Sequence, residues 1–134
     1  MTAAVDHQVQ ECYAEAVKLD ALKILYLYGG STLKGLDCSK ADSWVLKAGG
    51  ILTQLMGTHE LETTDELADG IGANQTLWVA NTELLEHSLL EFDMPGHGQQ
   101  FWAARTKGTL VGFFPLDGGR HYLLAAGFKP RRRP

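Results

Sequence analysis

Apolar side chains recur at spacings of three and four residues along the start of the chain. From Val5 to Val17 they alternate with polar residues, which predicts an amphipathic helix with one buried face. The next run, residues 22–28, is nearly all apolar, so its pattern fits either a buried helix end or a short strand. We favour a helix that continues to Tyr28, where Gly29 and Gly30 end it.

A second helix is predicted from the apolar stripe between Ala41 and Met56. Ser39 with Asp42 resembles a capping box at its start, and Gly57 supplies an end. The pair Gly49–Gly50 falls inside this stripe, and we expect a kink there.

Two further helices and one strand are predicted before residue 93. A short helix starts at Thr63 or Thr64, and residues 76–80 have the composition of a strand. Thr82 would then cap a helix that runs through Phe92. Residues 1–92 are therefore expected to be mainly helical.

The C-terminal third has the pattern of a strand meander. Residues 99–106, 109–115 and 120–128 are separated by Lys107-Gly108 and by residues 117–119, and both separators are hairpin signals. Counting outward from two-residue loops places Trp102 opposite Phe113, with Leu124 next in the same row, while Phe101, Phe114 and Leu123 form the row on the other face. Both faces of the meander are therefore apolar.

Helices followed by strands indicate a single domain of the α+β class over residues 1–134. The expected architecture is N-terminal helices packed on a C-terminal antiparallel meander of three to four strands. Helices cover one apolar face, and the other needs a further layer or a second copy of the chain. We expect a homodimer through the sheet, with its interface among Phe101, Trp102, Phe113 and Phe114.

The composition is that of a globular protein, with 45% hydrophobic and 21% charged residues, which excludes a disordered, collagen-like or coiled-coil chain. No apolar run is long enough to span a membrane, and the first seven residues lack the order of a signal peptide. We therefore expect a soluble, cytoplasmic protein with reduced cysteines.

Charge is distributed unevenly along the chain. Residues 1–128 carry all 16 acidic residues and eight basic ones, a net charge of −8, and residues 129–134 form a basic tail that adds four positive charges. The pairing count places this tail beside the end of the first meander strand, which predicts a basic edge that binds the anionic groups of a protein or nucleic acid. Its members are Arg105, Lys107, Lys129, Arg131, Arg132 and Arg133.

Chemistry-bearing motifs are missing from the sequence. It contains no GxxxxGK[ST], GxGxxG, GxSxG or HExxH pattern, and its cysteines and histidines lack metal-ligand spacing. We predict no metal site, no cofactor and no assembled catalytic constellation.

The segments 101–105, 111–119 and 123–129 resemble the strand meander of RelE-type ribonuclease toxins. That resemblance implies a basic RNA-cleaving surface on the sheet, for which His97 or His121 would have to lie near the basic edge. The chain departs from the family pattern in its net charge of −4 and its longer helical front.

The function expected from the sequence is that of a small non-catalytic binding or regulatory protein that acts on a macromolecular partner. The first alternative is the RelE-like ribonuclease just described. The second is a small-molecule site between the helices and the two-faced sheet.

Overall fold

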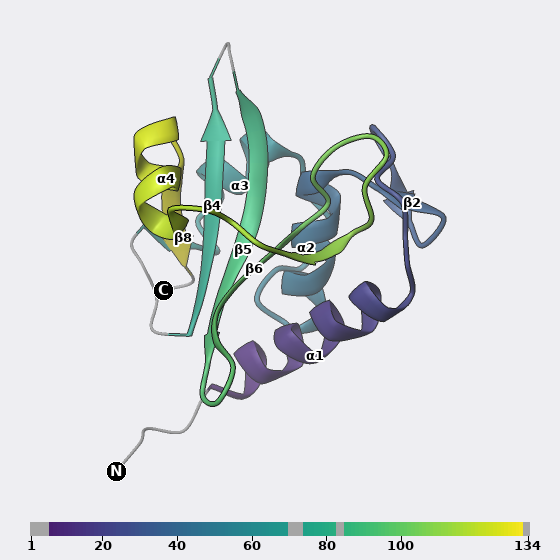
Figure 1. Cartoon of the computed structure of the whole chain (residues 1–134), viewed down its shortest axis with the longest axis horizontal. Helices are drawn as coiled ribbons and strands as arrows, with labels where there is room; N and C mark the ends of the chain where they lie inside the picture. The colour runs from purple at the N-terminus through teal and green to yellow at the C-terminus, as the bar shows by residue number, and fades with distance from the viewer. Residues whose placement is uncertain (1–5, 70–73, 83–84, 133–134) are drawn as a thin grey trace.

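The computed structural model describes residues 6–69, 74–82 and 85–132, and it contains a six-stranded antiparallel sheet with helices on both faces (Figure 1). The helices and strands in chain order are α1 (His7–Ala21), β1 (Ser31–Thr32), β2 (Gly35–Leu36), α2 (Cys38–Ala48), α3 (Thr58–Thr63), β3 (Ala68–Asp69), β4 (Gln75–Asn81), β5 (Glu86–Met94), β6 (Gly98–Ala103), β7 (Gly112–Phe114), α4 (Gly119–Ala126) and β8 (Lys129–Arg132). The predicted α+β class, with N-terminal helices on an antiparallel sheet, is confirmed. None of the described helices combines the length and apolar character needed to cross a membrane.

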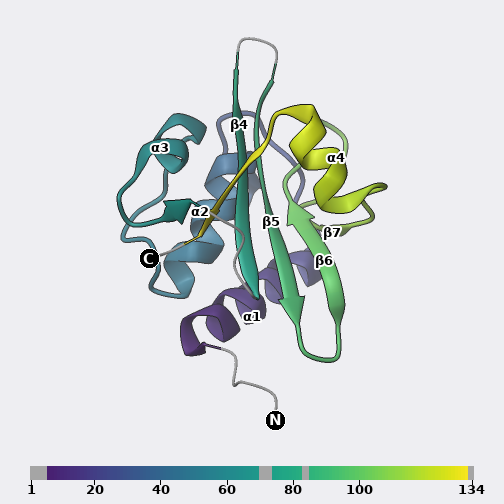
Figure 2. The same ribbon diagram turned by 90° about the vertical axis from the view of Figure 1, so that its left-hand side faces the viewer.

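The sheet has the strand order β3-β8-β4-β5-β6-β7, and a separate small hairpin joins β1 to β2. Helices α1 and α2 cover one face, and α4 lies on the other (Figure 2). Under α1 and α2, strands β4, β5 and β6 bury Leu77, Val79, Leu90, Phe92 and Trp102. Under α4, the same strands bury Trp78, Leu89 and Phe101 together with Leu123 and Phe128.

The strand predicted over residues 76–80 and the register of the first hairpin are confirmed. Phe101 pairs with Phe114 and Trp102 pairs with Phe113, as the count from Lys107-Gly108 requires. Local turn chemistry was sufficient for this pairing, because the two strands are neighbours in the chain.

The third strand of the predicted meander is wrong, because residues 119–126 form helix α4. Gly118 and Gly119 have φ of +81° and +50°, and Gly127 ends the helix with φ +100°. The Phe128 amide bonds back to the Leu123 carbonyl at 2.9 Å, which closes the last turn. Gly118 and Gly119, which were expected to form a hairpin turn, therefore lie at the start of a helix that Gly127 ends.

The tail predicted from residue 129 onward begins as a strand. β8 lies between β3 and β4, and Leu77, Trp78 and Val79 pair with Arg131, Pro130 and Lys129. The chain reaches this place because α4 carries it back along the sheet, which no local sequence signal indicates.

The helix predicted from Thr82 to Phe92 is also wrong. Residues 86–94 form β5, whose partners are β4 and β6, while residues 83–84 lie outside the described part of the chain. Leu89 faces α4, and Leu90 and Phe92 face the opposite side. A strand buried on both faces loses the alternation that would have identified it.

The observed boundaries of the second and third helices differ from the predicted ones, and glycines lie at the positions where they differ. α2 is capped by Asp37, whose carboxylate accepts from the Lys40 amide at 2.8 Å, and it ends at Ala48 without the expected kink. Gly49 lies so close to Cys12 of α1 that no side chain fits, and Gly50 has φ +75°. α3 lies before the predicted start at Thr63 and begins after Gly57, whose amide donates to the Glu60 carboxylate at 3.2 Å.

The apolar run over residues 22–28 is not helical, because residues 24–27 are extended between a turn at residues 22–23 and another at Tyr28. Lys23 has φ +58°, and the chain then pairs with two distant segments. The Tyr26 amide donates to the Thr109 carbonyl and the Leu27 amide donates to the Leu36 carbonyl, both at 3.0 Å. The hydrophobic pattern of this run fits either a helix or a strand, and hydrogen bonds to remote segments determine its conformation.

Candidate functional site

The predicted basic edge is only partly assembled. Arg105 and Lys107 follow β6, and Lys129 pairs with Val79 at the same end of the sheet. Strands β4 and β5 lie between them, so Lys129 stands roughly 14 Å from the β6 side. Among the members that the structure describes, no continuous basic edge forms across this end.

Arg131 is a structural residue rather than an anion-binding one. Its side chain is buried, and its guanidinium donates to the carbonyls of Leu61, Glu62, Thr64 and Leu67 at 2.6–2.9 Å. These bonds fasten α3 and the segment after it to β8. Arg132 ends β8, and Arg133 lies outside the described residues.

The predicted dimer interface is largely buried within one chain. Phe101 and Trp102 are buried, and Phe113 and Phe114 are partly buried. The Trp102 indole donates to the Ala16 carbonyl of α1 at 3.0 Å, and Phe101 packs in the cluster under α4. Because α4 covers the second face, the reason for expecting a second copy there is removed.

The histidines named for the ribonuclease alternative do not lie beside Arg105. His97 lies beyond the other end of β6, eight residues or roughly 26 Å of extended chain before Arg105. His121 is exposed on α4, next to Arg120, which reaches Asp93 near that same far end. The histidine influenced by Arg105 is His87, whose pKa is lowered by burial and then by the Arg105 charge. Its ring is 6.1 Å from Phe128.

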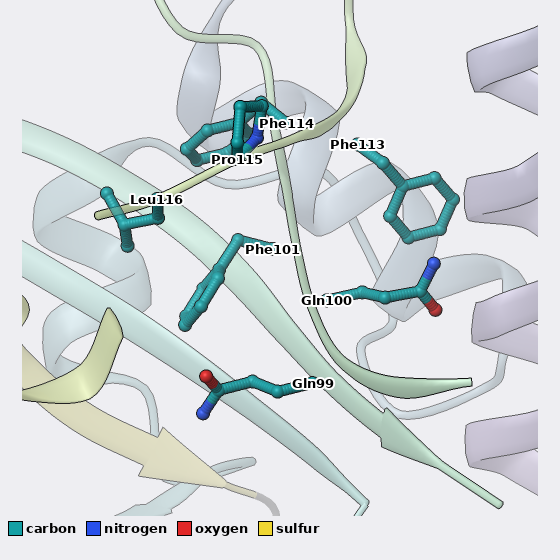
Figure 3. Close-up of a pocket in the computed structure, with 7 residues that line it drawn as sticks. All are labelled: Gln99, Gln100, Phe101, Phe113, Phe114, Pro115 and Leu116. Carbon is teal, nitrogen blue, oxygen red and sulfur yellow. The ribbon is translucent and has the colours of Figure 1, made fainter. Parts of the chain in front are cut away.

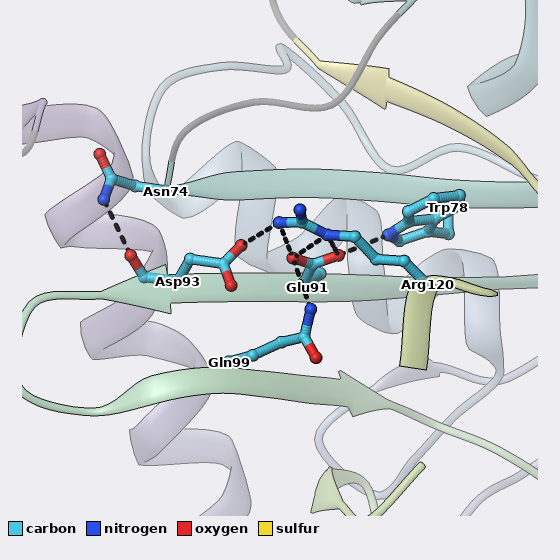
Figure 4. A network of polar contacts seen from close by, with 6 residues as sticks. All are labelled: Asn74, Trp78, Glu91, Asp93, Gln99 and Arg120. Carbon is cyan, nitrogen blue, oxygen red and sulfur yellow. Dashed lines mark hydrogen bonds and ion pairs between the residues drawn. The ribbon is translucent and has the colours of Figure 1, made fainter. Parts of the chain in front are cut away.

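A buried ion network joins α4 to the sheet (Figure 4). Glu91 of β5 is fully buried and accepts from the Trp78 indole at 3.0 Å and from Arg120 Nε at 2.8 and 2.9 Å. Arg120 Nη2 also contacts Glu91 and lies 2.9 Å from Asp93 Oδ2, while the Gln99 amide donates to Glu91 at 3.4 Å. Arg120 thus bridges two carboxyl groups that lie on the same face of β5.

The two carboxyl groups in this network have different acidities. Burial raises the pKa of Glu91, but hydrogen bonds from Arg120, Asp93 and Trp78 outweigh burial and leave that pKa below its ordinary value. Burial, together with the hydrogen bond and charge of Glu91, raises the pKa of Asp93 to about 7. Asp93 therefore exchanges a proton near neutral pH while Glu91 stays ionised.

A cavity of about 420 Å³ opens where β7 ends (Figure 3). Its lining consists of Gln99, Gln100, Phe101 and residues 113–116. Pro115 turns the chain away from β6, so Gln99 and Gln100 pair with β5 and have no strand beside them on the cavity side in the described structure. Rings and carboxamides without an ionisable group suit binding rather than proton transfer or nucleophilic attack.

An exposed apolar surface lies at the end of α1. We define the leucine surface as Leu25, Leu27, Tyr28 and Leu110, whose exposed fractions are 55%, 53%, 90% and 42%. Leu25 pairs with Leu110, and Leu27 lies against the backbone of Gly35. The half-buried Tyr26 packs against the core, so the leucines on either side of it in the extended segment remain in solvent.

The segments that form the leucine surface carry only positive charge. Residues 22–36 contain Lys23 and Lys34, and residues 105–116 contain Arg105 and Lys107, with no acidic residue in either segment. The rest of this acidic chain has a net charge of −8. The sequence indicated Arg105 and Lys107 but not Lys23 and Lys34, because the two segments that carry them are joined only when residues 24–27 pair with residues 109–111.

The cysteines and acidic clusters do not add a reactive centre. Cys12 and Cys38 are free and buried, and burial first, then the Asp42 charge, raises the pKa of the Cys38 thiol to about 11. Within the described ranges, no group of three or more His, Cys, Asp and Glu side chains is arranged to hold a metal ion.

No protein-family model matches this chain, and no curated protein does.

Proposed function

We propose that this protein is a non-catalytic binding protein that docks a macromolecular partner on the leucine surface. The supporting observation is that four large apolar side chains stand 42–90% exposed on two segments that pair through Leu25 and Leu110. Covering such side chains removes apolar area from water, at roughly 25 cal/mol for each Å² buried. Clustered exposure of this kind marks interaction sites more often than scattered single residues do.

The leucine surface is held in shape before any partner arrives. Main-chain hydrogen bonds link residues 24–27 to Thr109, Val111 and Leu36 at 2.7–3.4 Å. A preformed extended segment loses little conformational entropy on binding, which favours affinity. The buried acids support the non-catalytic reading, because Glu91 is engaged by Arg120 and Trp78 within the fold.

The test compares two double variants in affinity capture from the cell that makes the protein. Leu25→Ser with Leu27→Ser removes apolar area from the leucine surface. Val17→Ser with Leu124→Ser removes it from α1 and α4, where exposure is 44% and 54%. A protein captured by wild type and by the second variant, lost with the first, and bound again after its own purification supports the proposal.

Equal capture by both double variants would contradict docking at the leucine surface. Native mass measurement of wild type covers the outcome in which the partner is a second copy, since the homodimer expected from the sequence remains untested. A cytoplasmic location also stays a prediction from the sequence.

A small-molecule function is the second candidate, and the cavity at the end of β7 favours it. The lining offers the rings of Phe101, Phe113 and Phe114 and the carboxamides of Gln99 and Gln100 to a planar ligand with amide-like polar edges. Phe114→Ala should then weaken ligand-induced thermal stabilisation in a small-molecule screen, and an unchanged response would contradict this candidate.

A further inference from the structure

We infer that the partner contacts the leucine surface through a protein segment in which Asp or Glu side chains flank apolar ones, an inference that rests on the docking function proposed above. The leucine surface is bordered by Lys23, Lys34 and Lys107, with Arg105 beyond them. Complementary charge at the rim of an apolar contact steers association and selects the partner.

The positive charges around this surface are not neutralised from within. No ion pair found in the described part of the chain involves these four residues. The acids at the borders of the segment have other roles, because Asp20 accepts from the Phe113 amide at 3.0 Å and Asp37 caps α2. The Arg105 guanidinium lies 4.7 Å from the Phe114 ring centroid and keeps its charge.

A lysine lies close in the chain to each leucine of the surface or to a residue that the leucine contacts. Lys23 is two residues before Leu25. Lys34 lies in the turn between β1 and β2, next to Gly35, whose backbone Leu27 contacts. Lys107 lies in the turn after β6, three residues before Leu110, which pairs with Leu25.

The apolar part of the surface favours a protein over a nucleic acid. Sequence-tolerant nucleic-acid binding uses aromatic platforms on which successive bases stack. Here three of the four apolar side chains are leucines, and Tyr28 is the single ring. Aliphatic side chains are complementary to leucine-like groups of a protein segment and offer bases no stacking face.

The first experiment uses a displayed library of random 12-residue peptides as the probe, with the full chain as bait. Peptides that also bind the Leu25→Ser, Leu27→Ser variant are subtracted, after circular dichroism has verified that this variant folds. We expect the remaining peptides to be enriched in Asp and Glu around apolar residues.

The outcomes separate the two levels of the proposal. Recovery of apolar peptides without acidic enrichment would overturn the inferred charge and leave docking intact. Recovery of no peptide that depends on Leu25 and Leu27 would overturn the docking function itself.

The second experiment measures binding of a recovered acidic peptide by fluorescence anisotropy. Lys23→Glu with Lys34→Glu should weaken binding about tenfold at low salt. Lys47→Glu with Lys129→Glu makes the same charge change at exposed positions elsewhere and should leave binding within about twofold. The difference should shrink as salt rises from about 50 to 500 mM, because added ions screen exposed charges.

Equal weakening by both charge-reversal variants would overturn the inference, because net charge alone would then explain the loss. A single-stranded RNA of 20 nucleotides is the competing probe. RNA that binds more tightly than the peptide, and loses affinity with Lys23→Glu and Lys34→Glu, would also overturn it in favour of a nucleic-acid partner.

Discussion

Asp42 and Glu91 are both fully buried, one on each side of the six-stranded sheet. Asp42 projects from α2 toward β5, where the Ser88 hydroxyl donates to it at 2.6 Å. Burial raises its pKa well above the ordinary value, which favours the neutral carboxyl. Glu91 faces α4 and stays ionised because Arg120, Trp78 and Gln99 donate to it.

The comparison shows how helix size relates to the polarity of the contact. α1 and α2 are 15 and 11 residues long and bury several apolar side chains each, so a single buried carboxyl is tolerated between α2 and β5. α4 has eight residues and buries Leu123, and its ion pair with Glu91 supplements this apolar contact. Buried ion pairs specify geometry more reliably than they add stability, so we expect Arg120 to orient α4.

The largest expected effect is the loss of stability when a buried apolar side chain is truncated on either face of the sheet. Trp102→Ala should destabilise the protein by about 3–5 kcal/mol, and Leu123→Ala by about 2–3 kcal/mol, because Trp102 leaves the larger cavity. Trp102 is fully buried and its indole donates to Ala16, so its loss also leaves that carbonyl without this bond. Urea unfolding measures both changes. If Trp102→Ala does not fold, the unfolding free energy of Trp102→Phe is compared with that of Leu123→Ala instead.

A greater loss for Leu123→Ala than for the Trp102 variants would contradict the assignment of the main core to the α1 and α2 face.

The second effect concerns the ion pair. Arg120→Met should destabilise the fold by about 2–4 kcal/mol, because a fully buried Glu91 loses its charged partner. We place this below the usual cost of breaking a buried pair, since the Arg120 side chain is 36% exposed and water partly replaces it. Thermal unfolding of the single variant and of Arg120→Met with Glu91→Met gives the comparison.

The double variant should be closer to wild type than the single variant, because it removes the unpaired charge. A double variant as unstable as the sum of both singles would show that no coupling exists between the two side chains.

The third effect is the loss of stability when the buried carboxyl group on each face of the sheet is replaced by an amide. Glu91→Gln should destabilise the protein by about 1–3 kcal/mol, because Arg120 loses the carboxylate it bridges. Asp42→Asn should leave stability within about 1 kcal/mol at pH 5, because burial favours the neutral carboxyl and an amide oxygen can still accept from Ser88. Chemical denaturation at pH 5 measures both variants, and equal losses would contradict the assigned protonation states.

The last effect is the pH dependence of the α4 contact. The pKa of Asp93 is about 7 in the folded protein, against about 4 in an unfolded chain, so unfolding releases a proton between these values. Asp93 therefore stabilises the fold at low pH, and this contribution is lost as pH rises from about 4 to 7. Glu91 acts oppositely, since its lowered pKa means that its contribution is lost as pH falls through that pKa.

Asp93→Asn should flatten the fall in stability between pH 4 and 7, with thermal unfolding as the measurement. Asp65→Asn, at an exposed position, is the matched control and should keep the wild-type profile. A wild-type stability that rises from pH 5 to pH 7, with Asp93→Asn removing the rise, would contradict the expected loss of stability with rising pH.

The candidate site could be predicted from the sequence only in fragments. Arg105 and Lys107 were identified as basic groups near a sheet edge, yet the partners assigned to them were Lys129 and Arg131. In the structure, Arg131 donates hydrogen bonds to four backbone carbonyls. Lys23 and Lys34 are the basic residues on the segment that carries Leu25 and Leu27 of the leucine surface. These placements depend on contacts between residues far apart in the chain, which periodicity does not report.

By itself the sequence determined what short-range physics controls. The apolar spacing in α1, the composition of β4 and the Lys107-Gly108 turn were enough for the first helix, a central strand and the pairing of Trp102 with Phe113. Each depends on interactions within one element or between neighbouring strands.

Only the tertiary structure decided the elements whose apolar residues face two sides or pair with distant partners. Residues 24–27 extend because Thr109 and Leu36 bond them, and β5 is a strand because β4 and β6 flank it. The glycines around α4 allow a turn or a helix, and the helix forms where Leu123 can be buried and Arg120 can reach Glu91. Local propensities leave these alternatives close in free energy, and long-range burial and hydrogen bonding select between them.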